Sequence, residues 1–300
     1  MKELKGAITA LVTPMKENGE VDYDGFKRLV NFQLEQGIDG IVPLGTTGEA
    51  PTMEEAEEEK LIRISMDEAK GKVPVIVGTG SNDTKHMLAY TKRAKDMGAD
   101  IAMVVTPYYN KPNDDGLVRH FEAAAGVGIP ILVYNIASRT GRNIPTPLMD
   151  KIAAIPGIMG VKEASGDIGQ MAEVLQTIAF PRRGGGSSFS VLSGDDGFTL
   201  PLLSLGGNGV VSVIANLVPA RVKALVKAGL SGDFEEARKI HFELLPFMKA
   251  AFIETNPVPI KQAMTWAGLP GGPARLPMGR LDPKNEAPLK AAMGKIGFSV

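Results

Sequence analysis

Cysteine is the first thing this chain lacks: none occurs in its 300 residues. Without thiols the protein can form no disulfide, no thiolate metal site and no cysteine nucleophile. Such a composition is typical of proteins that work in the reducing cytoplasm.

An excess of charge of either sign is missing as well, because 33 basic residues face 34 acidic ones and leave a net charge of -1. No basic stripe stands out, so the sequence favours neither a nucleic-acid partner nor a membrane surface. No apolar run is long enough to span a bilayer, and the charged segment 1–6 has no signal-peptide core. We therefore expect a soluble, cytoplasmic globular protein.

Cofactor and metal motifs are also absent. The three histidines, His86, His120 and His241, are scattered over predicted helices, so they indicate neither a metal triad nor a Ser-His-Asp arrangement. No Walker loop occurs. Asp195 and Asp196 could bind a divalent ion, but the sequence offers no clear further ligands. We therefore expect no metal.

What is present is an alternation of short β-branched runs with longer amphipathic stretches, which predicts a parallel sheet covered by helices. The predicted strands are Gly6–Val12, Gly40–Leu44, Val73–Val77, Ile101–Val105, Ile129–Tyr134, Ile158–Lys162, Ser190–Leu192 and Gly209–Val213. The predicted helices between them include Tyr23–Gln36, Met53–Ala69, Asn82–Met97, Leu117–Ala125 and Ile168–Ile178. An open doubly wound sheet would normally place a glycine-rich turn after its first strand, whereas 12–15 reads Val-Thr-Pro-Met. Eight units without that turn favour a closed α/β (β/α)8 TIM barrel.

The C-terminal part of the sequence reads differently, as helix upon helix. The helices expected there are Asp233–Ala251, Val258–Ala267 and Pro283–Ile296. We therefore expect a barrel of residues 1–225 followed by a C-terminal helical region of residues 226–300. The glycine-rich stretch 183–188 precedes its strand, so it predicts a flexible surface loop rather than a phosphate cradle.

Lys162 is the leading candidate for chemistry, because it lies inside the apolar, strand-like run 157–166. A buried ammonium costs several kcal/mol unless it is paired or neutral. Desolvation can lower an ordinary lysine pKa of ~10.4 by roughly three units, and the free amine can then attack a ketone to form a Schiff base. Alternatively, Lys162 reaches solvent at the strand end or pairs with Glu163 or Asp167.

Polar groups follow most of the predicted strands, and the reactive face of a TIM barrel is where its strands end. These groups are Thr46 and Thr47, Gly78–Ser81, Thr106–Pro112, Tyr134 and Asn135 with Arg139 beyond them, Lys162, Gly194–Asp196, and Ser212. We expect them to converge on one rim. Taken singly, each motif also has an ordinary explanation: a βα turn at Thr46, a core tyrosine at Tyr134, packing at Tyr109, and a solvated loop arginine at Arg139.

Five of these segments, in order, resemble the family of class I pyruvate aldolases typified by dihydrodipicolinate synthase and N-acetylneuraminate lyase. The matching segments are 6–14, 45–49 (Gly-Thr-Thr-Gly-Glu), 108–112 (Tyr-Tyr-Asn-Lys-Pro), 138–141 (Ser-Arg-Thr-Gly) and 256–261. The resemblance covers essentially the whole chain, and the three middle motifs look like the synthase branch.

The resemblance implies a set of site residues. Lys162, Tyr134, Thr46 and Tyr109 would be catalytic, with Lys162 as the Schiff-base lysine and the other three as a proton relay. Thr47, Arg139, Gly194 and Val211 would bind substrate. The two threonines would hold the pyruvate carboxylate, Arg139 the carboxylate of the second substrate, and Gly194 and Val211 pyruvate itself through their backbones.

The activity implied is the condensation of pyruvate with L-aspartate 4-semialdehyde to 4-hydroxytetrahydrodipicolinate, a step of lysine and diaminopimelate biosynthesis. No cofactor is needed, because the covalent lysine imine serves instead. Tyr109 would be donated across a dimer interface, which implies a homotetramer built as a dimer of dimers. Ala137 departs from the family's usual proline in the loop that aims Arg139. The alternatives are a related lyase acting on another aldehyde or 2-keto sugar acid, and a non-enzymatic barrel that only binds a keto acid.

Overall fold

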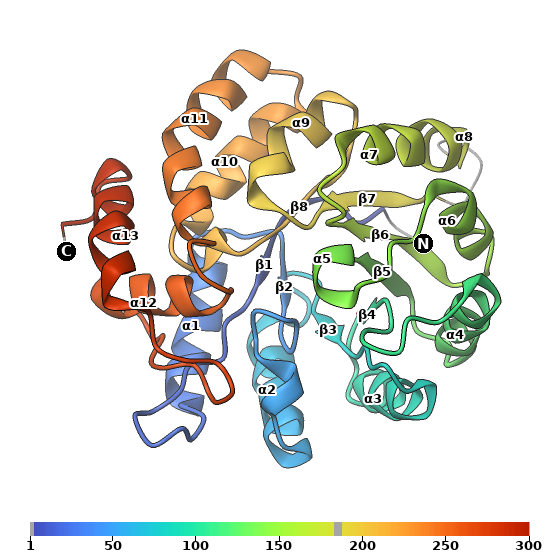
Figure 1. Cartoon of the computed structure of the whole chain (residues 1–300), viewed down its shortest axis with the longest axis horizontal. Coiled ribbons are helices and arrows are strands. Elements are labelled where there is room, and N and C mark those ends of the chain that lie inside the picture. The colour runs from blue at the N-terminus through green and yellow to red at the C-terminus, as the bar shows by residue number, and fades with distance from the viewer. Residues whose placement is uncertain (1–2, 183–187, 300) are drawn as a thin grey trace. The chain divides into compact units, whose positions relative to one another are not determined.

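The computed structural model describes residues 3–182 and 188–299, and it contains eight strands interleaved with helices (Figure 1). The strands are β1 (Gly6–Ala10), β2 (Gly40–Val42), β3 (Ile76–Gly78), β4 (Ile101–Val105), β5 (Ile131–Asn135), β6 (Ile158–Glu163), β7 (Ser190–Ser193) and β8 (Gly209–Ser212). The loop expected at 183–188 lies outside the described residues, except for Ser188.

The strands form one sheet in the order β2-β1-β8-β7-β6-β5-β4-β3. The pair β1–β2 and the successive pairs from β3–β4 to β7–β8 are parallel. At the end of this order, Ile41 of β2 makes a parallel bridge to Val75, the residue before β3. The chain therefore has the predicted (β/α)8 barrel fold, with further helices at its C-terminus.

The chain divides into two compact units, which we describe separately. The first unit comprises Met1–Gly6 and Ile76–Val211, and the second comprises Ala7–Val75 and Ser212–Val300. The division expected from the sequence, at residue 225, falls inside the helix Pro219–Leu230 and stays a prediction.

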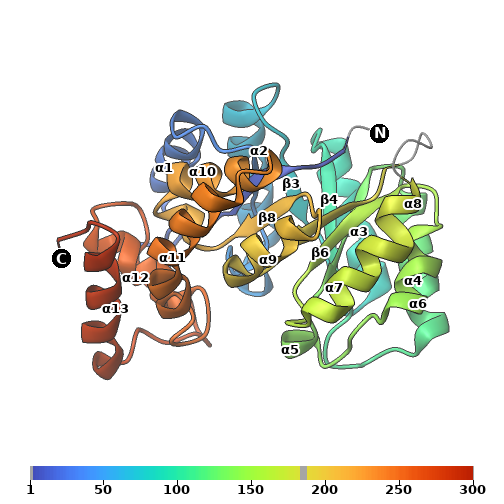
Figure 2. The same ribbon diagram turned by 90° about the horizontal axis from the view of Figure 1, so that it is seen from above.

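In the first unit, helices pack in succession against the strands (Figures 1 and 2). They are α3 (Thr84–Asp96), α4 (Asp114–Gly126), α5 (Ala137–Thr140), α6 (Thr146–Ala153), α7 (Ile168–Val174), α8 (Phe180–Arg182) and α9 (Thr199–Ser204). Val133 of β5 and Val161 of β6 belong to one core cluster with Phe121 of α4 and Met171 of α7. Because side chains alternate along a strand, the residues that follow these two valines face away from that helix layer.

The second unit contains the helices that precede and follow the first unit in sequence. They are α1 (Tyr23–Glu35), α2 (Glu55–Ala69), α10 (Pro219–Leu230), α11 (Phe234–Ala250), α12 (Val258–Trp266) and α13 (Pro283–Lys295). Helix α1 packs on α2, while α11 packs on both α10 and α13. A buried glutamine fixes α1, since Gln33 accepts a hydrogen bond from Thr9 Oγ1 at 2.6 Å and donates one to the Ala215 carbonyl at 2.9 Å.

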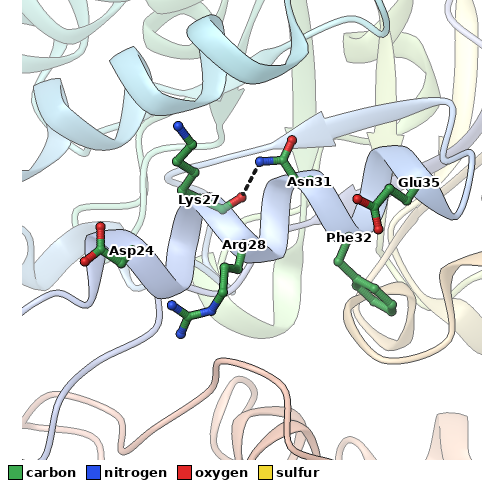
Figure 3. Close-up of a pocket in the computed structure, with 6 residues that line it drawn as sticks. All are labelled: Asp24, Lys27, Arg28, Asn31, Phe32 and Glu35. Atoms are coloured by element: carbon green, nitrogen blue, oxygen red, sulfur yellow. Dashed lines mark hydrogen bonds between the residues drawn. The ribbon is translucent and has the colours of Figure 1, made fainter.

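The opposite face of α1 carries a hollow (Figure 3). Its lining residues are Asp24, Lys27, Arg28, Asn31, Phe32 and Glu35. All six residues come from one helix, and the charged ones are of both signs. The hydrogen bond drawn among them runs from Asn31 Nδ2 to the Lys27 carbonyl at 3.2 Å. Such a face does not bring groups from several elements together, as a ligand site usually does.

Three local features differ from the sequence prediction. Residues 138–141, expected to be a loop, belong mostly to the short helix α5, which ends at Gly141 with a φ of 70°. Helix α6 was not predicted, although Pro145 immediately precedes it. The helix expected over Ile168–Ile178 is α-helical only to Val174 and continues as a π-helical turn over Leu175–Ala179.

Candidate active site

Lys162 lies near the end of β6, and its side chain is buried, with 4% of its surface exposed. In the sheet register it pairs with Tyr134 of β5. Its Nζ lies 4.0 Å from the centroid of the Tyr134 ring. These two predicted site residues are therefore in contact, on the strand face away from the helices.

Burial lowers the pKa of Lys162 from 10.5 to about 7. Loss of hydration is the largest cause, because it penalises the charged ammonium. The carboxylate of Asp196 opposes this shift, and the guanidinium of Arg139 adds to it. Near neutral pH roughly half of the molecules would carry a free amine, compared with about one in a thousand for an ordinary lysine.

The two carboxylates that could have paired with Lys162 are engaged elsewhere. Asp167 caps the N-terminus of α7, where its side chain accepts hydrogen bonds from the backbone N–H groups of Gly169 and Gln170. Glu163 follows Lys162 on the strand and so faces the helix layer, where it is fully buried. The alternative of a solvated or simply paired lysine therefore has no support in this geometry.

Glu163 is the centre of a polar cluster that the sequence analysis missed. Its carboxylate accepts hydrogen bonds from Asn135 Nδ2 at 3.1 and 3.2 Å, from the Ser165 N–H at 2.8 Å and from Gln170 Nε2 at 3.3 Å. Burial raises the pKa of Glu163, and these donors oppose the rise. Because Asn135 follows Tyr134 as Glu163 follows Lys162, this bond ties the two strands together beside Lys162 and Tyr134.

Gly194 follows β7 and lies against the lysine. A Cβ atom at this position would come within 3.2 Å of Lys162 Cε and 2.7 Å of the Ala164 methyl group. A side chain at Gly194 would therefore clash with Ala164 and crowd the carbon chain of Lys162, so this position favours glycine. Val211, also predicted to bind substrate, is buried in β8 with 1% of its surface exposed.

Arg139 and Tyr109 are exposed in this single chain. Arg139 lies on α5, which begins at Ala137. Tyr109 is 90% exposed and has a positive φ of 71°, a conformation that non-glycine residues adopt rarely. Next to it, Asn110 Nδ2 donates to the Asn82 carbonyl at 2.7 Å and anchors the loop.

Thr46 and Thr47 belong to the second unit, in a turn that follows β2. The turn is closed by hydrogen bonds from the Gly48 N–H to the Gly45 carbonyl at 3.0 Å and from the Glu49 N–H to the Thr46 carbonyl at 3.1 Å. Thr46 is half-buried and Thr47 is buried. A turn of this kind presents backbone N–H groups and hydroxyls, which are suitable donors for a carboxylate.

The same turn has partners in the C-terminal region that the sequence analysis also missed. Asn256 Nδ2 donates to Thr47 Oγ1 at 2.9 Å, and Lys261 Nζ lies 2.5 Å from a Glu49 carboxylate oxygen. One signal was available, because Lys261 is a charged residue in a mostly apolar stretch, 257–264.

A metal site is not evident in residues 3–182 and 188–299, which contain no cluster of three or more His, Asp or Glu side chains suited to an ion. Asp195 instead accepts a hydrogen bond from the Gly197 N–H at 2.8 Å, and Asp196 is buried. Over the same residues, no helix is both long and apolar enough to cross a bilayer.

Comparison with known proteins identifies the family. The model of the dihydrodipicolinate synthetase family matches residues 3–296. A 4-hydroxy-tetrahydrodipicolinate synthase of Protochlamydia amoebophila is 50% identical over 92% of this chain and 91% of its own. The corresponding synthase of Nitratidesulfovibrio vulgaris is 46% identical over 99% of both chains. This chain therefore belongs to the dihydrodipicolinate synthetase family.

Solved structures agree with this assignment. The crystal structure of dihydrodipicolinate synthase from Thermotoga maritima superposes with a TM-score of 0.94 at 40% identity and covers 99% of both chains. A monomeric dihydrodipicolinate synthase variant superposes equally well, with a TM-score of 0.94 at 39% identity over 99% of this chain and 98% of its own.

Proposed function

We propose that the protein is a 4-hydroxy-tetrahydrodipicolinate synthase, which condenses pyruvate with L-aspartate 4-semialdehyde. The observation that carries the proposal is the buried amine of Lys162, with a pKa lowered to about 7, in contact with the ring of Tyr134. The relatives at 43–50% identity that bear this name support the choice of substrates.

The chemistry follows from the neutral amine. Lys162 attacks the ketone carbon of pyruvate and forms an imine with loss of water. The protonated imine withdraws electrons, so a methyl proton leaves and an enamine forms. The enamine carbon then bonds to the aldehyde carbon of the second substrate. The amino group of that substrate closes the ring by displacing Lys162, which leaves as the free amine.

Proton transfers along this path fall to hydroxyl groups. We assign them to Tyr134, Thr46 and Tyr109, with Tyr134 nearest to the lysine. Thr46 and Thr47 bind the pyruvate carboxylate, and Gly194 and Val211 contact pyruvate through their backbones. Arg139 binds the carboxylate of the semialdehyde, for which its planar guanidinium is suited. The lysine imine takes the place of a cofactor.

The proposal includes a homotetramer, a dimer of dimers, in the cytoplasm. It is supported by the exposure of Tyr109, whose hydroxyl would act in the site of a second subunit. Analytical ultracentrifugation of the protein should give a tetramer. A monomer with full activity would remove Tyr109 from the relay.

Borohydride trapping tests the reaction itself. Reduction in the presence of pyruvate should add one pyruvate-derived group, and peptide mapping should place it on Lys162. Turnover should then require L-aspartate 4-semialdehyde among a panel of aldehydes. A label on another residue, or turnover with a sugar-derived aldehyde in preference, would contradict the proposal.

A further inference from the structure

Several residues of the C-terminal region meet the turn 45–49, and all of them belong to the second unit. Asn256 lies just before α12 and donates to Thr47 Oγ1 at 2.9 Å. Both side chains are buried, with 4% and 3% of their surfaces exposed. This bond fixes the rotamer of a threonine to which we assign carboxylate binding.

A buried ion pair holds the next part of the turn. Lys261 of α12 is 1% exposed, and its Nζ lies 2.5 Å from Glu49 Oε1 and 2.9 Å from the Thr13 carbonyl oxygen. The other Glu49 oxygen accepts a hydrogen bond from the Arg275 N–H at 2.8 Å. Burial lowers the pKa of Lys261, while the carboxylate of Glu49 opposes the shift and favours the ammonium.

The turn needs such support because its backbone is unusual. Leu44 and Glu49, which flank it, have positive φ values of 57° and 58°. Non-glycine residues adopt this conformation only when the surrounding structure fixes it. The Thr13 hydroxyl adds a further bond, to the Gly48 carbonyl at 2.7 Å.

A buried ion pair is weak evidence for a gain in stability, since an apolar pair of similar volume often does as well. What such a pair supplies is a defined geometry for the groups around it. Here those groups are the N–H groups and hydroxyls of Thr46 and Thr47, which are separated from Asn256 and Lys261 by more than two hundred residues of sequence.

We propose that Asn256 and Lys261 are positioning residues that hold the Thr46–Thr47 turn in the conformation that binds the pyruvate carboxylate. The C-terminal helical region thereby contributes to substrate affinity without touching substrate. This inference rests on the proposed function, because it takes pyruvate as the ligand of the turn.

The test uses Asn256→Ala and Lys261→Met in the full-length protein. Asn285→Ala is the matched control, because Asn285 Nδ2 makes a comparable bond, 2.7 Å long, to Glu254 within the C-terminal region. The rate of borohydride labelling at Lys162 is measured against pyruvate concentration, and circular dichroism verifies folding.

For Asn256→Ala we expect the half-saturating pyruvate concentration to rise about 3- to 12-fold, within the range expected for one lost hydrogen bond. The maximal labelling rate and the KM for the aldehyde should change less than about threefold, because the reacting groups stay in place. For Lys261→Met we expect a larger rise in the half-saturating pyruvate concentration, again with little change in the maximal labelling rate. The control should match the wild type.

An unchanged half-saturating concentration in folded Asn256→Ala would overturn the inference, and so would an equal rise in the control. If Lys261→Met does not fold, the result for Asn256→Ala is sufficient to test the inference. If the wild-type protein is not labelled at Lys162 in the presence of pyruvate, the proposed function is overturned, and the inference with it. If the wild type and the variants are labelled with the same dependence on pyruvate, only the inference is overturned.

Discussion

Two buried lysines, one in each unit, have different neighbours. Lys261 is 1% exposed, with a carboxylate 2.5 Å from its Nζ. Lys162 is 4% exposed, with an aromatic ring 4.0 Å from its Nζ, and burial lowers its pKa to about 7. The residue type and the burial are alike, so the neighbouring groups decide whether the amine is held in an ion pair or can lose its proton near neutral pH.

The comparison also separates two ways of tolerating a buried charge. At Lys261 the carboxylate of Glu49 compensates the charge of the ammonium. The ion pair then serves to hold the surrounding groups in a defined geometry. At Lys162 the carboxylate of Asp196 compensates desolvation only in part, and a proton can leave near neutral pH. An imine-forming enzyme requires the second arrangement.

The largest effect is expected for Lys162→Met. Turnover should fall by about 10³-fold or more, because the proposed reaction passes through an imine of this amine. Steady-state kinetics with pyruvate and L-aspartate 4-semialdehyde measure this. Residual activity within tenfold of the wild type would show that another nucleophile carries the reaction.

The two lysines should respond with opposite signs when stability is measured. Lys261→Met leaves Glu49 buried without its partner and should lower the free energy of unfolding by about 3–5 kcal/mol. Lys162→Met should instead raise it at pH 7, by as much as about 4 kcal/mol. Urea unfolding followed by circular dichroism measures both. Equal losses in the two variants would show that Lys162 is also held by a compensating charge.

The sign for Lys162 follows from proton linkage. Its folded pKa of about 7 lies below the unfolded value of 10.5, so the unfolded chain binds the extra proton between these pH values. The resulting loss in the free energy of unfolding is complete below pH 7 and decreases as the pH rises toward 10.5. The advantage of Lys162→Met should therefore shrink between pH 7 and pH 10.

A smaller effect is expected for Arg139→Ala. The KM for the semialdehyde should rise about tenfold, and that for pyruvate by less than about threefold, because we assign the arginine to the carboxylate of the second substrate. Initial rates with each substrate varied in turn provide the test. Equal increases in both constants would contradict this role.

Sequence patterns sufficed for the fold, and the family resemblance grouped Lys162 with Tyr134, which are in contact in the structure. The eight strands were predicted because β-branched runs and amphipathic stretches are local signals. Successive side chains of a strand point to opposite faces of the sheet, so Leu132 and Tyr134 lie on the same face. For the same reason, Val161 and Lys162 had to face opposite ways.

Tertiary partners could not be predicted in this way. Glu163 accepts bonds from Asn135 on the neighbouring strand, and Lys261 pairs with Glu49 across 212 positions of sequence. No local pattern records which distant groups meet. The four-residue helix α5 was missed because so short a segment has no periodicity to detect.

The central claim is that Lys162 is a neutral amine near neutral pH, and the pH dependence of imine formation tests it most directly. The rate of borohydride-trapped labelling at Lys162, at subsaturating pyruvate, should rise with pH and reach half its maximum near pH 7, since burial lowers the pKa of Lys162 to about 7. A half-maximum above about pH 9.5 would mean that the lysine is an ordinary ammonium and would contradict the account.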